Sequence, residues 1–118
     1  MAITAVSLTP RTHGFAVNAS SADLSGCEEV VAAVASKSIV LSQVVISCVA
    51  AITVTLGAGE TTGAVTAVVL GPVNFAATSG SPYTVKFEPP IQLASATALV
   101  ADASGAGAVC IFAQGYYE

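Results

Sequence analysis

Few residues of this chain have the types and the spacing that catalysis requires. The only histidine, His13, lies between Pro10 and Gly14, and none of the serines occupies a G-x-S-x-G turn of the kind that exposes a nucleophile. A serine or cysteine nucleophile needs a neighbouring base that activates it. We therefore predict that the protein is not an enzyme and that none of its residues is catalytic.

The carboxylates lead to the same expectation. The chain has seven acidic residues, and among them only Glu28 and Glu29 are adjacent. Glycoside hydrolysis needs two carboxyl groups that flank one bond across a cleft. Neighbouring residues of a strand point to opposite faces, so Glu28 and Glu29 do not form such a pair.

The residue pattern also predicts no metal and no cofactor. Cys27, Cys48 and Cys110 lack the close pairing of metal ligands, and the chain has no second histidine. We expect three free cysteines that behave as small buried hydrophobic residues, with a disulfide between two of them as the alternative. The segment GAGETTG at 57–63 departs from G-x-G-x-x-G and precedes a β-branched run, so it predicts a hairpin loop and not a phosphate site.

The low content of charged residues argues against a nucleic-acid partner and for association with other copies of the chain. The only basic residues are Arg11, Lys37 and Lys86, and the net charge is −4. Nucleic-acid binding needs clustered Lys and Arg, so we expect no nucleic-acid partner. Charged residues make up 8% of the chain and hydrophobic residues 54%. Other subunits must then cover part of its surface, and we expect a homo-oligomer.

The most apolar stretch, residues 37–56, is long enough to suggest a membrane span. Polar residues interrupt it, and its second half alternates as a half-buried strand does, so we predict two strands at 38–48 and 52–56 and no membrane partner. The first of these strands is apolar on both faces. One face carries Ile39, Leu41 and Val45, and the other carries Val40, Val44, Ile46 and Cys48.

Turn signals at short spacing divide the remainder of the chain into further strands. We predict an edge strand at 3–8 within an otherwise irregular N-terminal arm (about 1–25), and later strands at 64–70, 73–76, 83–88, 91–93, 98–102 and 109–116, with a turn at 103–107. Residues 28–35 fit either a strand, which we favour, or a two-turn helix. About eight strands in one domain, residues 1–118, predict an all-β fold, an antiparallel β-sandwich that is jelly-roll-like.

The aromatic residues divide between the predicted core and the predicted surface. No tryptophan is present, and the pattern favours packing over sugar stacking. Core-like positions hold Phe75, Tyr83, Phe87 and Phe112. Three aromatic residues remain for contacts with partners: Phe15, Tyr116 and Tyr117.

Residues 28–118 resemble a family. The segments AVASKSIVL, ITVTLGAGE and KFEPPIQLASATALVADASGAGAVCIFAQGYYE are similar to those of small jelly-roll proteins encoded among the structural genes of tailed bacteriophages. The matching positions are Lys37 to Leu41, Pro90-Ile91, Thr97 to Leu99, Ser104-Gly105 and Gly115-Tyr116. The arm shows no such likeness, and the chain carries fewer charges than is usual in the family.

The resemblance implies a structural protein of the virion. Such proteins commonly form trimers on the outside of the shell as decoration or cement proteins. The expected partner is then the major capsid protein and the expected location the capsid surface, after synthesis in the host cytoplasm. The alternative is a receptor-binding or adhesin module of a tail or fibre, but the loops GAGETTG, ATSGSP and ASGAG are small and favour packing over recognition.

The expectation of a trimeric virion protein predicts two sets of contact residues. Three copies could bury the second apolar face of strand 38–48, which gives a subunit interface at Val40, Val44, Ile46, Tyr116 and Tyr117. The arm is the expected contact with the shell, through Ile3, Val6, Leu8, Pro10, Arg11, His13 and Phe15.

Overall fold

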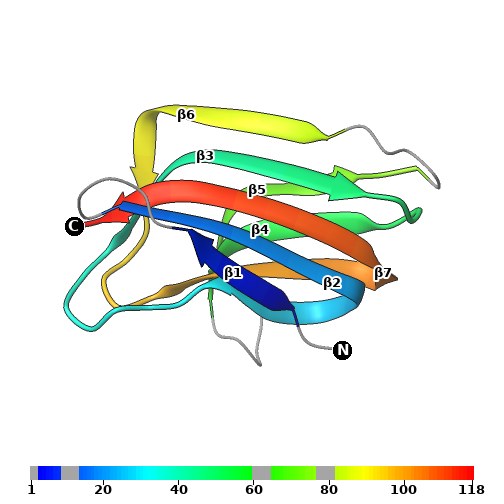
Figure 1. The fold of residues 1–118 in the computed structure, drawn as a ribbon, viewed down its shortest axis with the longest axis horizontal. Coiled ribbons are helices and arrows are strands. Elements are labelled where there is room, and N and C mark those ends of the chain that lie inside the picture. The colour runs from blue at the N-terminus through cyan, green and yellow to red at the C-terminus, as the bar shows by residue number, and fades with distance from the viewer. Residues whose placement is uncertain (1–2, 9–13, 60–64, 77–81) are drawn as a thin grey trace.

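The protein folds as one antiparallel sheet that curls into a half-barrel (Figure 1). The computed structural model describes residues 3–8, 14–59, 65–76 and 82–118. Its strands are β1 (Thr4–Leu8), β2 (Gly14–Val31), β3 (Ile39–Cys48), β4 (Thr53–Gly59), β5 (Val65–Asn74), β6 (Tyr83–Gln92) and β7 (Ala98–Tyr117). The all-β antiparallel class is confirmed, and the described residues form no helix. Residues 28–31 belong to β2, and a loop follows them.

The long strand β7 organises the sheet. One of its edges pairs with β2 along most of its length. Its other edge is shared, because β3 pairs with residues 109–117 and β4 pairs with residues 98–103. The sheet is then extended by β1 beside β2, by β6 beside β3 and by β5 beside β4.

Strands β2 and β7 bend together and continue into a second layer. Figure 1 shows both strands turning back at the right-hand end of the molecule. The register of β2 against β7 shifts on both sides of Leu24, which pairs with Gly107. We expected an irregular arm up to residue 25 and a turn at 103–107, and both expectations are wrong. The small residues at 103–107 let β7 bend without ending, since its partner bends at the same place.

This continuity also reduces the number of strands to seven from the expected eight or so. The two strands predicted on either side of 103–107 are the two halves of β7. Similarly, residues 73–74 complete β5, and residues 91–92 complete β6. The expected interruption at Pro89-Pro90 is seen inside β6, where residues 87–90 take no part in the pairing with β3.

The core lies between the two layers and takes side chains from nearly every strand. Leu56 of β4, Leu99 and Ile111 of β7, and Ile46 of β3 are at most 1% exposed. Each fully buried aliphatic side chain contributes roughly 1.5–3 kcal/mol to stability. Because β2 and β7 supply residues to both layers, a single hydrophobic cluster joins them.

A bulge in β3 changes which of its residues reach the core. Leu41 pairs with Gly115 and Gln43 pairs with Gln114, so Ser42 is an extra residue. The alternation shifts by one at this point. The side chains that point into the core are therefore Ile39 and Leu41 before the bulge, and Val44, Ile46 and Cys48 after it. The prediction that these residues divide between two apolar faces is wrong.

Candidate functional site

The surface most open to a partner is the side of the sheet that faces away from the core. It is formed by the outward side chains of β2, β7, β3 and β6 in the layer that also contains β1. In Figure 1 this side is turned toward the viewer, and β4 and β5 lie behind it. We call it the outer face, and its residues are Ala16, Asn18, Ser20, Val40, Gln43, Val45, Ser47, Thr84, Lys86, Gln92, Cys110, Phe112, Gln114 and Tyr116.

Strand register arranges the outer face in rows. The central row runs from Asn18 through Phe112 and Val45 to Thr84, one residue from each of four adjacent strands. Residues directly opposite each other in an antiparallel sheet have Cβ atoms about 4.5–5.5 Å apart. Phe112 and Val45 are half-buried. They therefore form an apolar centre that no other described element covers.

Mostly polar groups surround this centre. The next rows hold Ser20, Cys110 and Ser47 on one side, and Ala16, Gln114, Gln43 and Lys86 on the other. The Cys110 thiol donates a hydrogen bond of 3.2 Å to Asn18 Oδ1. Amides and hydroxyls both donate and accept hydrogen bonds, so the outer face offers packing and hydrogen bonding.

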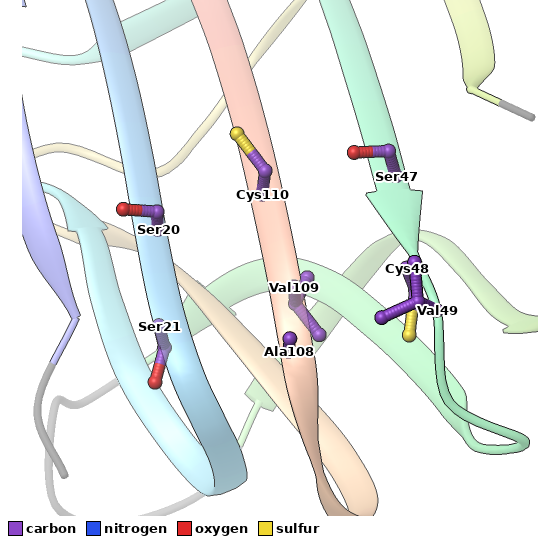
Figure 2. A pocket seen from close by; sticks show the side chains of 8 residues that line it. All are labelled: Ser20, Ser21, Ser47, Cys48, Val49, Ala108, Val109 and Cys110. Carbon is purple, nitrogen blue, oxygen red and sulfur yellow. The ribbon is translucent and has the colours of Figure 1, made fainter. Parts of the chain in front are cut away.

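A shallow depression at one end of the outer face is lined by serines and cysteines of β2, β3 and β7 (Figure 2). Three serines and two cysteines line it, together with small apolar residues: Ser20, Ser21, Ser47, Cys48, Cys110, Val49, Ala108 and Val109. The Ser21 hydroxyl is buried without a hydrogen-bond partner. The lining includes no histidine and no carboxylate, and such a base is what a serine or cysteine nucleophile requires.

Two further depressions lie near the free edge of β5. One is lined by apolar residues of β5 and of the segment 91–94, including Val68, Val69, Ile91 and Leu93. The other contains Glu29 beside Thr66 and Thr97. A single carboxylate there cannot provide the acid and base pair of a glycosidase.

The expected shell-contact residues lie in and before the first two strands. Ile3 is half-buried, and its N–H donates a hydrogen bond of 2.6 Å to Glu28 Oε1. Val6 and Leu8 belong to β1, the edge strand predicted at 3–8, and pair with Asn18 and Ala16 of β2. Pro10, Arg11 and His13 lie outside the described residues.

Phe15, which we expected to be available for contacts, is instead a core residue. It is 6% exposed, and its ring centroid lies 5.4 Å from that of Tyr117. Gly14 and Phe15 begin the paired part of β2, opposite Tyr116 and Gly115 of β7. The side chain of Phe15 therefore packs inside its own chain.

The expected subunit-interface residues fall into two groups. Val40 and Tyr116 are register partners on the outer-face side of the sheet, where Tyr116 is 39% exposed but Val40 only 3%. Val44 and Ile46 are 0% exposed and belong to the core. Tyr117 is half-buried on the core side, where its hydroxyl donates to the Ala32 carbonyl at 3.1 Å. Burial, and secondarily the charge of Glu29, raises the pKa of the Tyr117 hydroxyl.

Sequence reasoning missed most of the outer face. Phe112 was assigned to the core, although it lies outward between Asn18 and Val45. Residues 109–113 are apolar on both faces, so alternation gives no signal for the inward side. The amides Gln43 and Gln114 were the available signal, because each shares its face with Phe112.

No disulfide joins the three cysteines, as expected. Only Cys48 is fully buried, whereas Cys27 and Cys110 are half-buried. Burial raises the pKa of the Cys27 thiol, and the nearby carboxylates of Asp102 and Glu28 raise it further.

The described residues contain no group of three or more His, Cys, Asp or Glu side chains that could hold a metal ion. In the same part of the chain, no helix is long and apolar enough to cross a membrane. No protein-family model, curated protein or solved structure matches the chain.

Proposed function

We propose that the protein is a non-enzymatic structural protein of a tailed-bacteriophage virion, a decoration or cement protein that binds the outside of the shell as an oligomer. The observation that carries the proposal is the outer face, an open sheet surface with an apolar centre, amide and hydroxyl neighbours and almost no charge. Such a surface can bury area against another protein, and the outer-face residues named above include neither a histidine nor a carboxylate. The likeness of residues 28–118 to small phage jelly-roll proteins supports the choice of a virion.

Within this proposal the half-barrel belongs to the jelly-roll-like sandwiches. Seven antiparallel strands in two layers around one core support that assignment. A cement protein stabilises a shell by spreading contact area across the joints between shell subunits. An oligomer gains further from avidity, because its copies bind neighbouring sites together.

The N-terminal segment, residues 2–13, is the proposed contact with the major capsid protein. It contains β1, which lies at an edge of the sheet beside β2. The hydrogen bond from Ile3 N–H to Glu28 Oε1 holds the start of this segment against β2. A segment held at an edge can extend across a neighbouring surface without disturbing the core.

Co-sedimentation with phage shells tests the proposal. The purified protein is mixed with mature shells, pelleted, and the heat resistance of the shells is measured. We expect the protein to pellet with the shells and to raise the temperature at which they open. Removal of residues 2–13 should abolish pelleting, whereas Asn74→Asp, a change on exposed β5, should not. Protein that ignores every shell but binds host cells or glycans would overturn the proposal in favour of an adhesin.

A further inference from the structure

No other described element covers the centre of the outer face, although that centre is apolar. The other side of the same layer is packed against the core, which β4, β5, residues 27–31 of β2 and residues 98–103 of β7 complete. A second exposed apolar area lies at β5, where Val68 lines a depression together with Val69 and Ile91. Phe112 and Val45 are register partners across β7 and β3, and the row of Gln114 and Gln43 separates them from the exposed ring of Tyr116.

Charge identifies the partner that suits this face. Lys86, at its β6 margin, is the only charged residue of the outer face, whereas Glu28, Glu29 and Asp102 lie in the other halves of β2 and β7. The whole chain carries a net charge of −4. Two copies of an acidic chain repel each other wherever acidic residues meet, and they avoid this at a face whose named residues include no acidic one. A strongly charged partner would find no complementary charges here.

The polar groups of the face are suited to pairing with themselves. An isologous contact places the same patch on both sides, so the patch must be self-complementary. A carboxylate or an ammonium group cannot pair with its own copy, but an amide can, because it carries both donors and acceptors. Asn18, Gln43 and Gln114 supply three such amides around Phe112.

The area is sufficient for a dimer. Four strands spaced about 4.8 Å apart, with four rows about 6.8 Å apart, cover about 500 Å² per copy, or about 1,000 Å² for two. A biological interface should bury at least about 1,000 Å², and stable, specific ones typically bury about 1,200–2,000 Å². The expected dimer therefore lies at the lower limit for a biological interface and should dissociate on dilution.

We propose that two copies of this protein pack face to face through their outer faces, with Phe112 near the two-fold axis. This contact uses the outer face, on which the proposed function rests, and the partner that it places there is a second copy of the chain. Because its symmetry is two-fold, it is distinct from the trimeric arrangement that the phage resemblance implies.

The test measures self-association of the full chain without shells, by sedimentation velocity over a range of concentrations. We expect a monomer–dimer equilibrium. Gln114→Glu places a negative charge on each outer face with little change in shape, and the backbone carbonyl that accepts from Ser42 stays in place. The dissociation constant should rise about tenfold or more, because like charges then meet in the contact. The matched control is Asn74→Asp on β5, which should leave the constant unchanged.

A second measurement locates the contact. In a Cys27→Ser variant, Cys110 is the half-buried thiol that a maleimide can reach, since Cys48 is buried. Alkylation of Cys110 should slow at concentrations where the dimer forms and recover on dilution or in Gln114→Glu.

Three results would overturn the inference: a chain that stays monomeric, an oligomer that Gln114→Glu leaves intact, or a Cys110 whose reactivity ignores concentration. A trimer with reactive Cys110 would place the subunit contact elsewhere. Shell binding is measured separately. If monomeric Gln114→Glu still pellets with shells, the proposed shell binding stands and does not require the dimer.

Discussion

The Ser42 hydroxyl donates a hydrogen bond of 3.0 Å to the carbonyl of Gln114, at the point where β3 has one residue more than β7. This bond secures the bulge that places Leu41 and Val44 on the same side of the sheet. Without the extra residue, one of the two segments of β3 would present its aliphatic side chains outward. The bulge therefore decides both the composition of the core and the polarity of the outer face.

Removing the bulge should be far more damaging than removing its hydrogen bond. Ser42→Ala loses one partly exposed bond and should lower the free energy of unfolding by about 0.5–1.5 kcal/mol. Deletion of Ser42 shifts the register by one residue and moves buried side chains to the outer face. We expect that variant to lack a cooperative unfolding transition in urea, followed by circular dichroism. Equal stability of the two variants would contradict the role given to the bulge.

Adjacent residues beyond the bulge should differ in their effect on stability. Ile46 is 0% exposed, and Ile46→Ala should cost about 2–5 kcal/mol through lost contacts and a cavity. Val45 is half-buried on the outer face, and Val45→Ala should cost less than about 1 kcal/mol in the monomer. Urea unfolding at low protein concentration measures both. A larger loss of stability in Val45→Ala than in Ile46→Ala would mean that Val45, and not Ile46, points into the core.

Two glycines of β7 should respond differently to the same substitution. A Cβ at Gly115 would overlap the carbonyl of Val40 and lie 3.1 Å from the Phe15 ring, so Gly115→Ala must displace the β7–β3 pair. We expect a loss of about 1–3 kcal/mol or more. At Gly105 the nearest atom, Ile52 Cγ2, lies 3.5 Å away, and Gly105→Ala should change stability by less than about 0.5 kcal/mol. Thermal unfolding of the two variants gives the comparison.

Stability should fall in the alkaline range because of Tyr117. Burial, with a smaller effect of Glu29, raises the pKa of its hydroxyl in the folded state. The unfolded chain then loses this proton at a lower pH than the folded one. The contribution is complete below about pH 10, the ordinary pKa of tyrosine, and is lost as the pH rises through the folded value.

Tyr117→Phe should therefore flatten the dependence of stability on pH above about pH 10. It should also lower the plateau at neutral pH, because the bond from the hydroxyl to the Ala32 carbonyl is lost. Cys27→Ser is the control, since the pKa of that thiol is raised as well and its loss should flatten the curve from a lower pH. Urea unfolding at stepped pH gives both curves. An unchanged alkaline slope in Tyr117→Phe would contradict the burial of this hydroxyl.

The strands were predictable wherever apolar and polar residues alternate or turn residues separate them. The antiparallel pairing of β4 with β5 and the interruption of β6 at Pro89-Pro90 follow from such local signals. The loop predicted at 57–63 is wrong for residues 57–59, which continue β4 and pair with β5. The bends of β2 and β7 were not predictable, because serine and glycine, the residue types at 104, 105 and 107, occur both in turns and in bent strands. Tertiary pairing between two long strands decided the outcome.

The outer face was hidden from sequence analysis for a related reason. In residues 109–113 both faces are apolar, and one inserted residue in β3 reverses its alternation. The side to which Phe112 and Val45 point depends on the register between β3 and β7. That register is a contact between distant parts of the chain, and no local pattern carries it.

The pairing of β2 with β7 has a consequence for synthesis on the ribosome. Tyr116 leaves the ribosome long after its partner Gly14, because most of the described chain lies between them. The same holds along most of β2, so this strand waits, with Phe15 and Val17 exposed, until β7 has been made. Contacts between distant residues of this kind slow folding, and the exposed strand favours aggregation meanwhile. We therefore expect the sheet to form only after β7 has left the ribosome, and chaperones that hold nascent chains to raise the soluble yield.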